Sequence, residues 1–65
     1  MQKQNRRILR LPEVIERTGL SRSSIYSFIQ KNTFPKQISL GEKAVGWLEA
    51  DIDLWIEHKI NGVEV

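Results

Sequence analysis

The sequence predicts a winged helix-turn-helix, which is a mainly α-helical domain of three helices with one small two-stranded β-hairpin. Two short amphipathic segments are separated by Thr18-Gly19-Leu20-Ser21, the spacing of two helices joined by a tight turn. An alternating apolar segment with turn residues follows, and a third segment of helical period comes last. With 65 residues, the chain has room for one such domain and only a small core.

The first predicted helix runs from about Pro12 to Arg17. Proline suits the first turn of a helix because its missing N–H has no partner there, and Gly19 is typical of the residue that ends a helix. We expect residues 1–7 to form a flexible basic arm. Residues 8–10 are too short for more than a strand fragment.

The second predicted helix runs from Arg22 to about Lys31, and Ser21 is placed to cap its N-terminus. Apolar side chains recur at helical spacing on one face. The opposite face is polar, and its residues recur at i, i+1, i+4, i+5 and i+8: Arg22, Ser23, Tyr26, Ser27 and Gln30. In a helix-turn-helix this would be the recognition helix.

After Phe34-Pro35 the period changes from helical to alternating. Residues 37–40 and 44–47 are predicted to form the two strands of the hairpin, with Gly41-Glu42-Lys43 as the turn. Apolar residues then return to helical spacing, which predicts a third helix over 49–59 that ends near Asn61-Gly62. The predicted domain therefore covers residues 8–60, and 61–65 would be a C-terminal tail.

Charge is distributed unevenly along the chain. Basic residues outnumber acidic ones nine to three up to Lys43, and acidic residues outnumber basic ones five to one after it. One end of the folded domain would therefore attract a polyanion such as DNA. The chain has no cysteine, no apolar run of membrane-spanning length and no apolar stretch near its start, so we expect a cytoplasmic protein without membrane contact.

These features predict binding to double-stranded DNA. Small hydroxyls and an arginine let a helix approach base edges in the major groove, so we expect base contacts from the polar face of the second helix, with Ser21 at its start. Lys43 at the tip of the wing would meet a phosphate or the minor groove. Six basic residues are candidates for phosphate contacts: Arg6, Arg7, Arg10, Lys31, Lys36 and Lys43.

The sequence offers no catalytic centre, metal site or cofactor site. His58 is the only histidine and has no cysteine to complete a ligand set, so a surface position is expected for it. Asp51 and Asp53 lie two residues apart on a predicted helix and would diverge, which leaves them to stabilise the helix dipole. Trp47 and Trp55 lie in apolar patterns and are expected in the core, rather than on a platform that stacks single-stranded bases.

Four segments occur in a distinctive order and spacing: Arg10-Leu11-Pro12-Glu13-Val14, Thr18-Gly19-Leu20-Ser21-Arg22-Ser23-Ser24-Ile25-Tyr26, Phe34-Pro35-Lys36 and Val45-Gly46-Trp47-Leu48-Glu49. Over about residues 8–60, the sequence resembles the AlpA-type prophage regulators. The resemblance implies an excisionase-like or MerR-like DNA-binding fold and a transcriptional regulator of a prophage or mobile element. Ser27 stands where many members have a basic residue.

Two other functions remain open at this point. An excisionase-like architectural factor would bend DNA for an integrase instead of contacting the transcription machinery. A protein-interaction adaptor would use the acidic third helix and never engage DNA. Because one such module has a small DNA interface, useful specificity would need either self-association of several copies on DNA or a partner protein.

Overall fold

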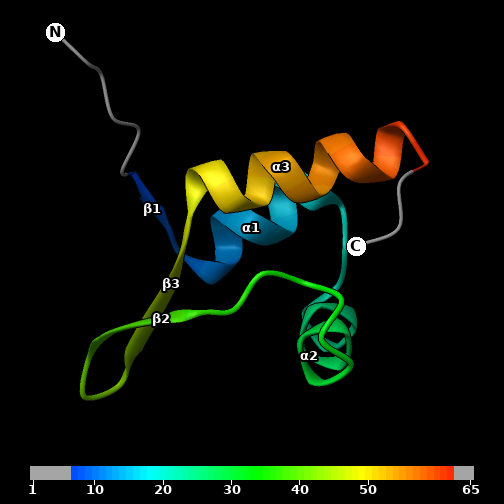
Figure 1. Cartoon of the computed structure of the whole chain (residues 1–65). Helices are drawn as coiled ribbons and strands as arrows, with labels where there is room; N and C mark the ends of the chain where they lie inside the picture. The colour runs from blue at the N-terminus through cyan, green and yellow to red at the C-terminus, as the bar shows by residue number, and fades with distance from the viewer. Residues whose placement is uncertain (1–6, 63–65) are drawn as a thin grey trace, which may run out of the picture.

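The computed structural model of the chain describes residues 7–62 (Figure 1). Three helices and three short strands follow one another in this order: β1 (Ile8–Leu9), α1 (Leu11–Thr18), α2 (Arg22–Gln30), β2 (Ile38–Gly41), β3 (Ala44–Leu48) and α3 (Glu49–Ile60). The predicted mainly α-helical winged fold is confirmed, and each predicted helix is present within one or two residues of its expected ends. The predicted arm and tail lie outside the described residues, apart from Arg7, Asn61 and Gly62.

The sheet has three strands, where the sequence predicted a two-stranded hairpin. Its order is β1-β3-β2, and both pairings are antiparallel. The fragment before α1 pairs with β3, so that Leu9 lies opposite Trp47, and the N–H of Glu49 donates to the carbonyl of Arg7 at 2.8 Å. The hairpin of β2 and β3 is the wing, and its register shifts between Ser39 and Gly41.

Gly46 allows β1 to lie against β3. A Cβ atom at this position would lie 2.5 Å from Cγ2 of Ile8 and 3.0 Å from the carbonyl oxygen of Leu9. It would also lie 3.1 Å from Cδ1 of Leu40, which reaches over from β2. A side chain would therefore collide with both neighbouring strands, which explains why glycine occupies the centre of this sheet.

The core lies between the sheet and the three helices. Its buried residues come from every part of the described chain: Leu9, Val14, Ile25, Phe34, Trp47, Ile52 and Trp55. Both tryptophans are buried as predicted, and both satisfy their indole N–H: Trp47 donates to the carbonyl of Pro35 at 3.1 Å, and Trp55 to that of Thr33 at 2.8 Å. Neither ring is available to stack on a nucleic acid base.

Local signals set the ends of the first two helices. Gly19 adopts the left-handed conformation with φ of 76° and donates its N–H to the carbonyl of Ile15 at 2.8 Å, which ends α1. Ser21 caps α2 through its side chain, which accepts the N–H of Ser24. After α2 the chain turns at Asn32, where φ is 62°, a value that asparagine tolerates better than most residues.

Candidate nucleic-acid interface

Helix α2 and the wing project on the same side of the molecule, away from α3. Figure 1 shows α3 along one edge, with α2 and the β2–β3 hairpin extending from the opposite edge. The helix and the hairpin thus protrude from the same edge with a gap between them, and the acidic third helix lies along the opposite edge. A recognition helix and a wing need this arrangement to reach one duplex together.

The sequence fixes which face of α2 is exposed. Ile25 is fully buried, and Phe28 and Ile29 pack against the core, so the opposite face must point outwards. Four of the five residues predicted on that face line one open hollow of about 450 Å³ together with Ile29: Ser23, Tyr26, Ser27 and Gln30. Tyr26 is 36% exposed and does not pack against the core. Its ring is therefore accessible on the outer face of α2.

Three serines hold the start of α2. The hydroxyl of Ser21 accepts the N–H of Ser24 at 3.1 Å and donates to the hydroxyl of Ser24 at 3.0 Å. The hydroxyl of Ser23 lies 3.4 Å from that of Ser21. The hydroxyl of Ser21 is thus engaged in capping the helix. The hydroxyl of Ser23 makes only the long contact with Ser21 and can bind a ligand.

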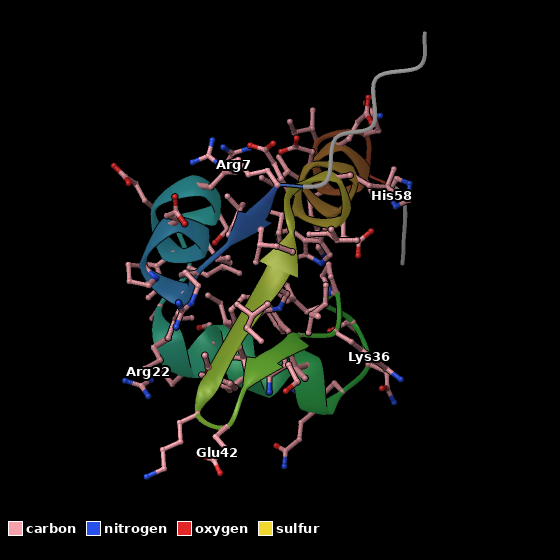
Figure 2. The ribbon with its side chains drawn as sticks, turned by 90° about the vertical axis from the view of Figure 1, so that its left-hand side faces the viewer. Arg7, Arg22, Lys36, Glu42 and His58 are labelled. Carbon is pink, nitrogen blue, oxygen red and sulfur yellow. The ribbon has the colours of Figure 1, made fainter. Side chains whose placement is uncertain are left out.

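Arg22 is the first residue of α2, and its side chain is exposed. Figure 2 shows it reaching away from the body of the domain, on the same half of the molecule as the wing tip at Glu42. Among residues 7–62 its guanidinium has no hydrogen-bond or ion-pair partner. Five N–H donors are therefore free at the point where such a helix would enter a groove.

Three lysines extend this exposed positive charge. Lys31 follows the last residue of α2, Lys36 lies in the loop before β2, and Lys43 lies in the wing turn. All three are exposed, and within the described chain none pairs with a carboxylate. We call the four cations the open basic face: Arg22, Lys31, Lys36 and Lys43.

Arg10, another predicted DNA contact, also makes hydrogen bonds within the domain. Its Nε donates to the carbonyl of Val45 on β3 at 3.0 Å, and its backbone N–H donates to the carboxylate of Glu13 at 3.0 Å. The side chain is exposed beyond that bond. Arg10 therefore ties the start of α1 to the sheet, and its contact with DNA stays a prediction.

A second set of charges pairs internally, and charge counting along the sequence did not reveal it. Arg17 on α1 meets Glu49 and Asp53 on α3, each at 2.9 Å. Arg7 lies 3.1 Å from the carboxylate of Glu13 and 3.8 Å from that of Glu49. We call these five residues the α1–α3 ion cluster. Arg7, a predicted phosphate contact, is thus placed among carboxylates, on the opposite half of the molecule from Arg22 (Figure 2).

Two members of the cluster have shifted pKa values. The backbone N–H of Arg10 holds the pKa of the Glu13 carboxyl below its usual range, and Arg7 adds to this. Hydrogen bonding to Asp53 raises the pKa of the Arg17 guanidinium, with Glu49 contributing as well. Both shifts favour the charged forms, so the Glu13 carboxylate and the Arg17 guanidinium are engaged by partners within the domain.

Other kinds of site were also sought in the part of the chain that the structure describes. No group of three or more His, Cys, Asp or Glu side chains in residues 7–62 is placed to hold a metal ion. None of the three helices is both long enough and apolar enough to cross a bilayer. The predicted contacts on α2 and the wing remain the candidate site.

Comparison with known proteins now gives the family. The family described as prophage CP4-57 regulatory protein (AlpA) matches residues 7–60. The DNA-binding transcriptional activator AlpA of Escherichia coli strain K12 is 48% identical over 59 residues, covering 82% of this chain and 84% of that protein. Uncharacterized protein ORF88 of Enterobacteria phage P4 is 50% identical over 56 residues, covering 86% of this chain and 64% of that protein. No solved structure was found to match. The chain belongs to the AlpA family of prophage regulatory proteins.

Proposed function

We propose that this protein binds a specific site on double-stranded DNA and regulates transcription from a prophage or related mobile element. The observation that carries the proposal is the exposed face of α2, where Ser23, Tyr26, Ser27 and Gln30 lie together. Hydroxyl and amide groups of this kind read base edges in the major groove. The name of the E. coli relative, a DNA-binding transcriptional activator, supports the same function.

In this proposal the open basic face positions the domain on the duplex. Arg22 would donate two bonds to the O6 and N7 of a guanine, because it stands in the first turn of the recognition helix. Lys31, Lys36 and Lys43 would hold phosphates on either side of the groove. Their charges are available because no carboxylate in residues 7–62 neutralises them.

A salt titration tests the electrostatic part. Three lysines that neutralise phosphates predict a slope of about −3 for log affinity against log salt concentration. Fluorescence anisotropy with duplexes from the element that encodes the protein would measure it, with a scrambled duplex as the control for specificity. A flat salt response, or equal affinity for both duplexes, would contradict the proposal.

Two assays distinguish transcriptional control from the alternative function, in which the bound protein assists an integrase. A reporter driven by the bound promoter, in a strain without integrase, measures transcriptional control alone. An excision assay with transcription blocked, combined with a measured DNA bend, detects the architectural role. Because a single module buries only about 600 to 1,000 Å², either role would need several copies or a partner protein.

A further inference from the structure

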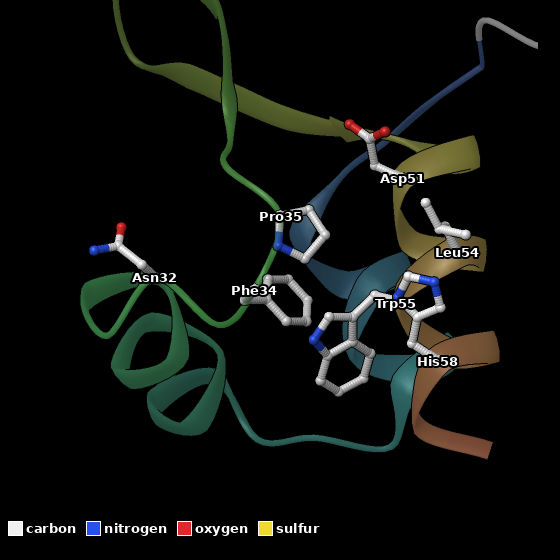
Figure 3. Close-up of a pocket in the computed structure, with 7 residues that line it drawn as sticks. All are labelled: Asn32, Phe34, Pro35, Asp51, Leu54, Trp55 and His58. Atoms are coloured by element: carbon white, nitrogen blue, oxygen red, sulfur yellow. The ribbon is translucent and has the colours of Figure 1, made fainter. Parts of the chain in front are cut away.

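A stripe on α3 has no counterpart in the DNA-binding proposal. Asp51, Leu54 and His58 are spaced i, i+3 and i+7, which places them on one face of the helix. Figure 3 shows that they line a hollow with residues of the loop between α2 and β2, including Phe34 and Pro35. The hollow is open, has a volume of about 250 Å³ and is mostly apolar. We call Asp51, Leu54 and His58 the α3 stripe.

Each member of the stripe lacks a partner within the described residues. Leu54 is 51% exposed although it lies beside the buried ring of Trp55. Asp51 is exposed and pairs with no cation, in contrast to Asp53, which pairs with Arg17. An apolar side chain and a carboxylate are therefore both presented to the outside.

His58 presents a hydrogen-bond donor next to them. Its Nδ1 is buried and finds no partner in residues 7–62. In the tautomer with the ring proton on Nε2, the buried Nδ1 needs no acceptor and the ring can donate to a carboxylate. The stripe thus has an acceptor at one end, a donor at the other, and an exposed leucine between them.

The stripe is complementary to itself when it is reversed. Asp51 and His58 lie at equal distances from a point between Leu54 and Trp55, about 5 Å away along the helix axis on either side. If a second α3 packs antiparallel across that point, each Asp51 faces a His58 of the other copy. The two Leu54 side chains then meet in the middle, over the apolar hollow.

We propose that the α3 stripe is the contact surface of a two-fold symmetric pair of this chain. Two identical contacts form, in which Nε2–H of His58 donates to the carboxylate of Asp51 in the second copy. Leu54 loses its exposure to water at the centre of the pair. The proposal goes beyond DNA binding and can be tested without DNA.

The charge of α3 argues against DNA as the occupant. Asp51 and Glu57 are exposed on this helix, and their carboxylates would repel a phosphate backbone. The loop that follows α2 borders the hollow, but α2 itself and the wing extend from the edge of the molecule opposite α3 (Figure 1). The residues predicted to read DNA on α2 are not among those that line the hollow.

The pair should be weak in free solution. A contact between two helices of 12 residues falls below the roughly 1,200 Å² that separates transient interfaces from stable ones. Two copies held on neighbouring sites of one duplex would associate at a much higher effective concentration. On neighbouring DNA sites, the contact between the two copies would therefore raise the affinity of each copy for DNA.

Sedimentation velocity over protein concentrations of about 10 μM to 1 mM tests the pair, since weak interfaces of this size become populated in that range. We expect the mean sedimentation coefficient to rise from that of a monomer towards that of a dimer. Leu54→Gln should abolish the rise. Ile60→Gln is the matched control, because Ile60 is 77% exposed on the same helix but lies outside the stripe, and it should behave like the wild type. A monomer at every concentration, or a dimer that survives Leu54→Gln, would overturn the proposal.

Two single variants provide a more specific test. Asp51→His places histidine opposite histidine in a homodimer, and His58→Asp places aspartate opposite aspartate, so each variant alone should stay monomeric. Mixed in equal amounts, they restore both Asp–His contacts in the heterodimer, and association should return. Melting curves show that each variant is folded during the measurement. If the mixture stays monomeric while the wild type dimerises, the antiparallel arrangement is wrong.

Discussion

Arg17 and Arg22 are five positions apart and have opposite surroundings. Arg17 on α1 makes two ion pairs of 2.9 Å with α3, and these raise its pKa. Arg22 on α2 is exposed and has no partner within residues 7–62. The same side chain therefore serves the fold in one helix and is available to a ligand in the next.

The two regions extend this contrast to the whole molecule. The α1–α3 ion cluster neutralises its arginines with carboxylates, whereas the four cations of the open basic face have no ion-pair partner among residues 7–62. A net charge of +2 for the chain describes neither region. The charge that matters for a polyanionic ligand is the charge that remains after internal pairing.

The largest effect on stability is expected from a substitution of Gly46, because the sheet around it supports both regions. Gly46→Ala places a Cβ atom 2.5 Å from Cγ2 of Ile8, so β1 must shift and the sheet that supports both regions is strained. We expect a loss of about 1 to 3 kcal/mol in the free energy of unfolding, the usual cost of overpacking. Chemical denaturation measures it.

Gly41→Ala is the matched control for this change. A Cβ atom at Gly41 meets no atom within 4 Å, so stability should stay close to that of the wild type. If Gly46→Ala were as stable as Gly41→Ala, the close approach of β1 to β3 would not limit the fold.

Exchanging the two arginines for alanine separates the regions directly. Arg22→Ala should cost about 1 to 3 kcal/mol in binding to the specific DNA site and relax the preference at one base pair, with an unchanged melting temperature. Arg17→Ala should lower the melting temperature and leave the base preference unchanged, because its partners are inside the fold. A panel of duplexes with single base substitutions, together with melting curves, measures both. An unaltered base preference for Arg22→Ala would assign base reading to other residues of α2.

A smaller effect is expected at the start of the recognition helix. Ser21→Ala removes the side chain that accepts the N–H of Ser24 at 3.1 Å, and loss of such a cap typically costs about 1 kcal/mol of stability. Ser23→Ala leaves that bond in place, so it should keep the stability and change DNA affinity only. Thermal melting and anisotropy distinguish the two serines. Equal melting temperatures for both variants would argue against the cap.

The smallest effect concerns the pH dependence of the ion cluster. The pKa of Glu13 is lowered in the folded state, so its contribution to stability is present above the ordinary value of 4.5 and is lost as the pH falls through the lower folded-state value. Glu13→Gln should therefore lower stability at neutral pH and match the wild type in strong acid. Denaturation curves at several pH values test this. A difference that stays constant down to acid pH would contradict the assigned cause.

The parts of the fold that were predictable from the sequence depend on neighbouring residues. Gly19 ends α1 and Ser21 begins α2 through contacts within four residues, and such signals can be recognised in a sequence. The exposed face of α2 follows in the same way from the spacing of Ile25, Phe28 and Ile29. Four of the five predicted recognition residues consequently line one surface, while their contact with DNA stays a prediction.

The parts that were not predictable join residues far apart in the chain. The pairing of β1 with β3 depends on Gly46 meeting Ile8, and two residues of strand carry no usable period. The ion cluster depends on the packing of α1 against α3, which charge counting cannot show. The α3 stripe was not predictable for the same reason. Recognising it requires knowing which face of α3 remains exposed after the helix packs on the core.

The pairing of β1 with β3 has a consequence for the growing polypeptide. Ile8 is among the first described residues to leave the ribosome, but its partner Leu48 is made 40 residues later. Helices α1 and α2 have the local signals to form early, whereas the sheet cannot close until β3 has emerged. A chain interrupted before Trp47 would expose the apolar faces of both helices with nothing to cover them. The sheet can therefore close only after β3 has been made, and a chain truncated before β3 should be a ready substrate for proteases.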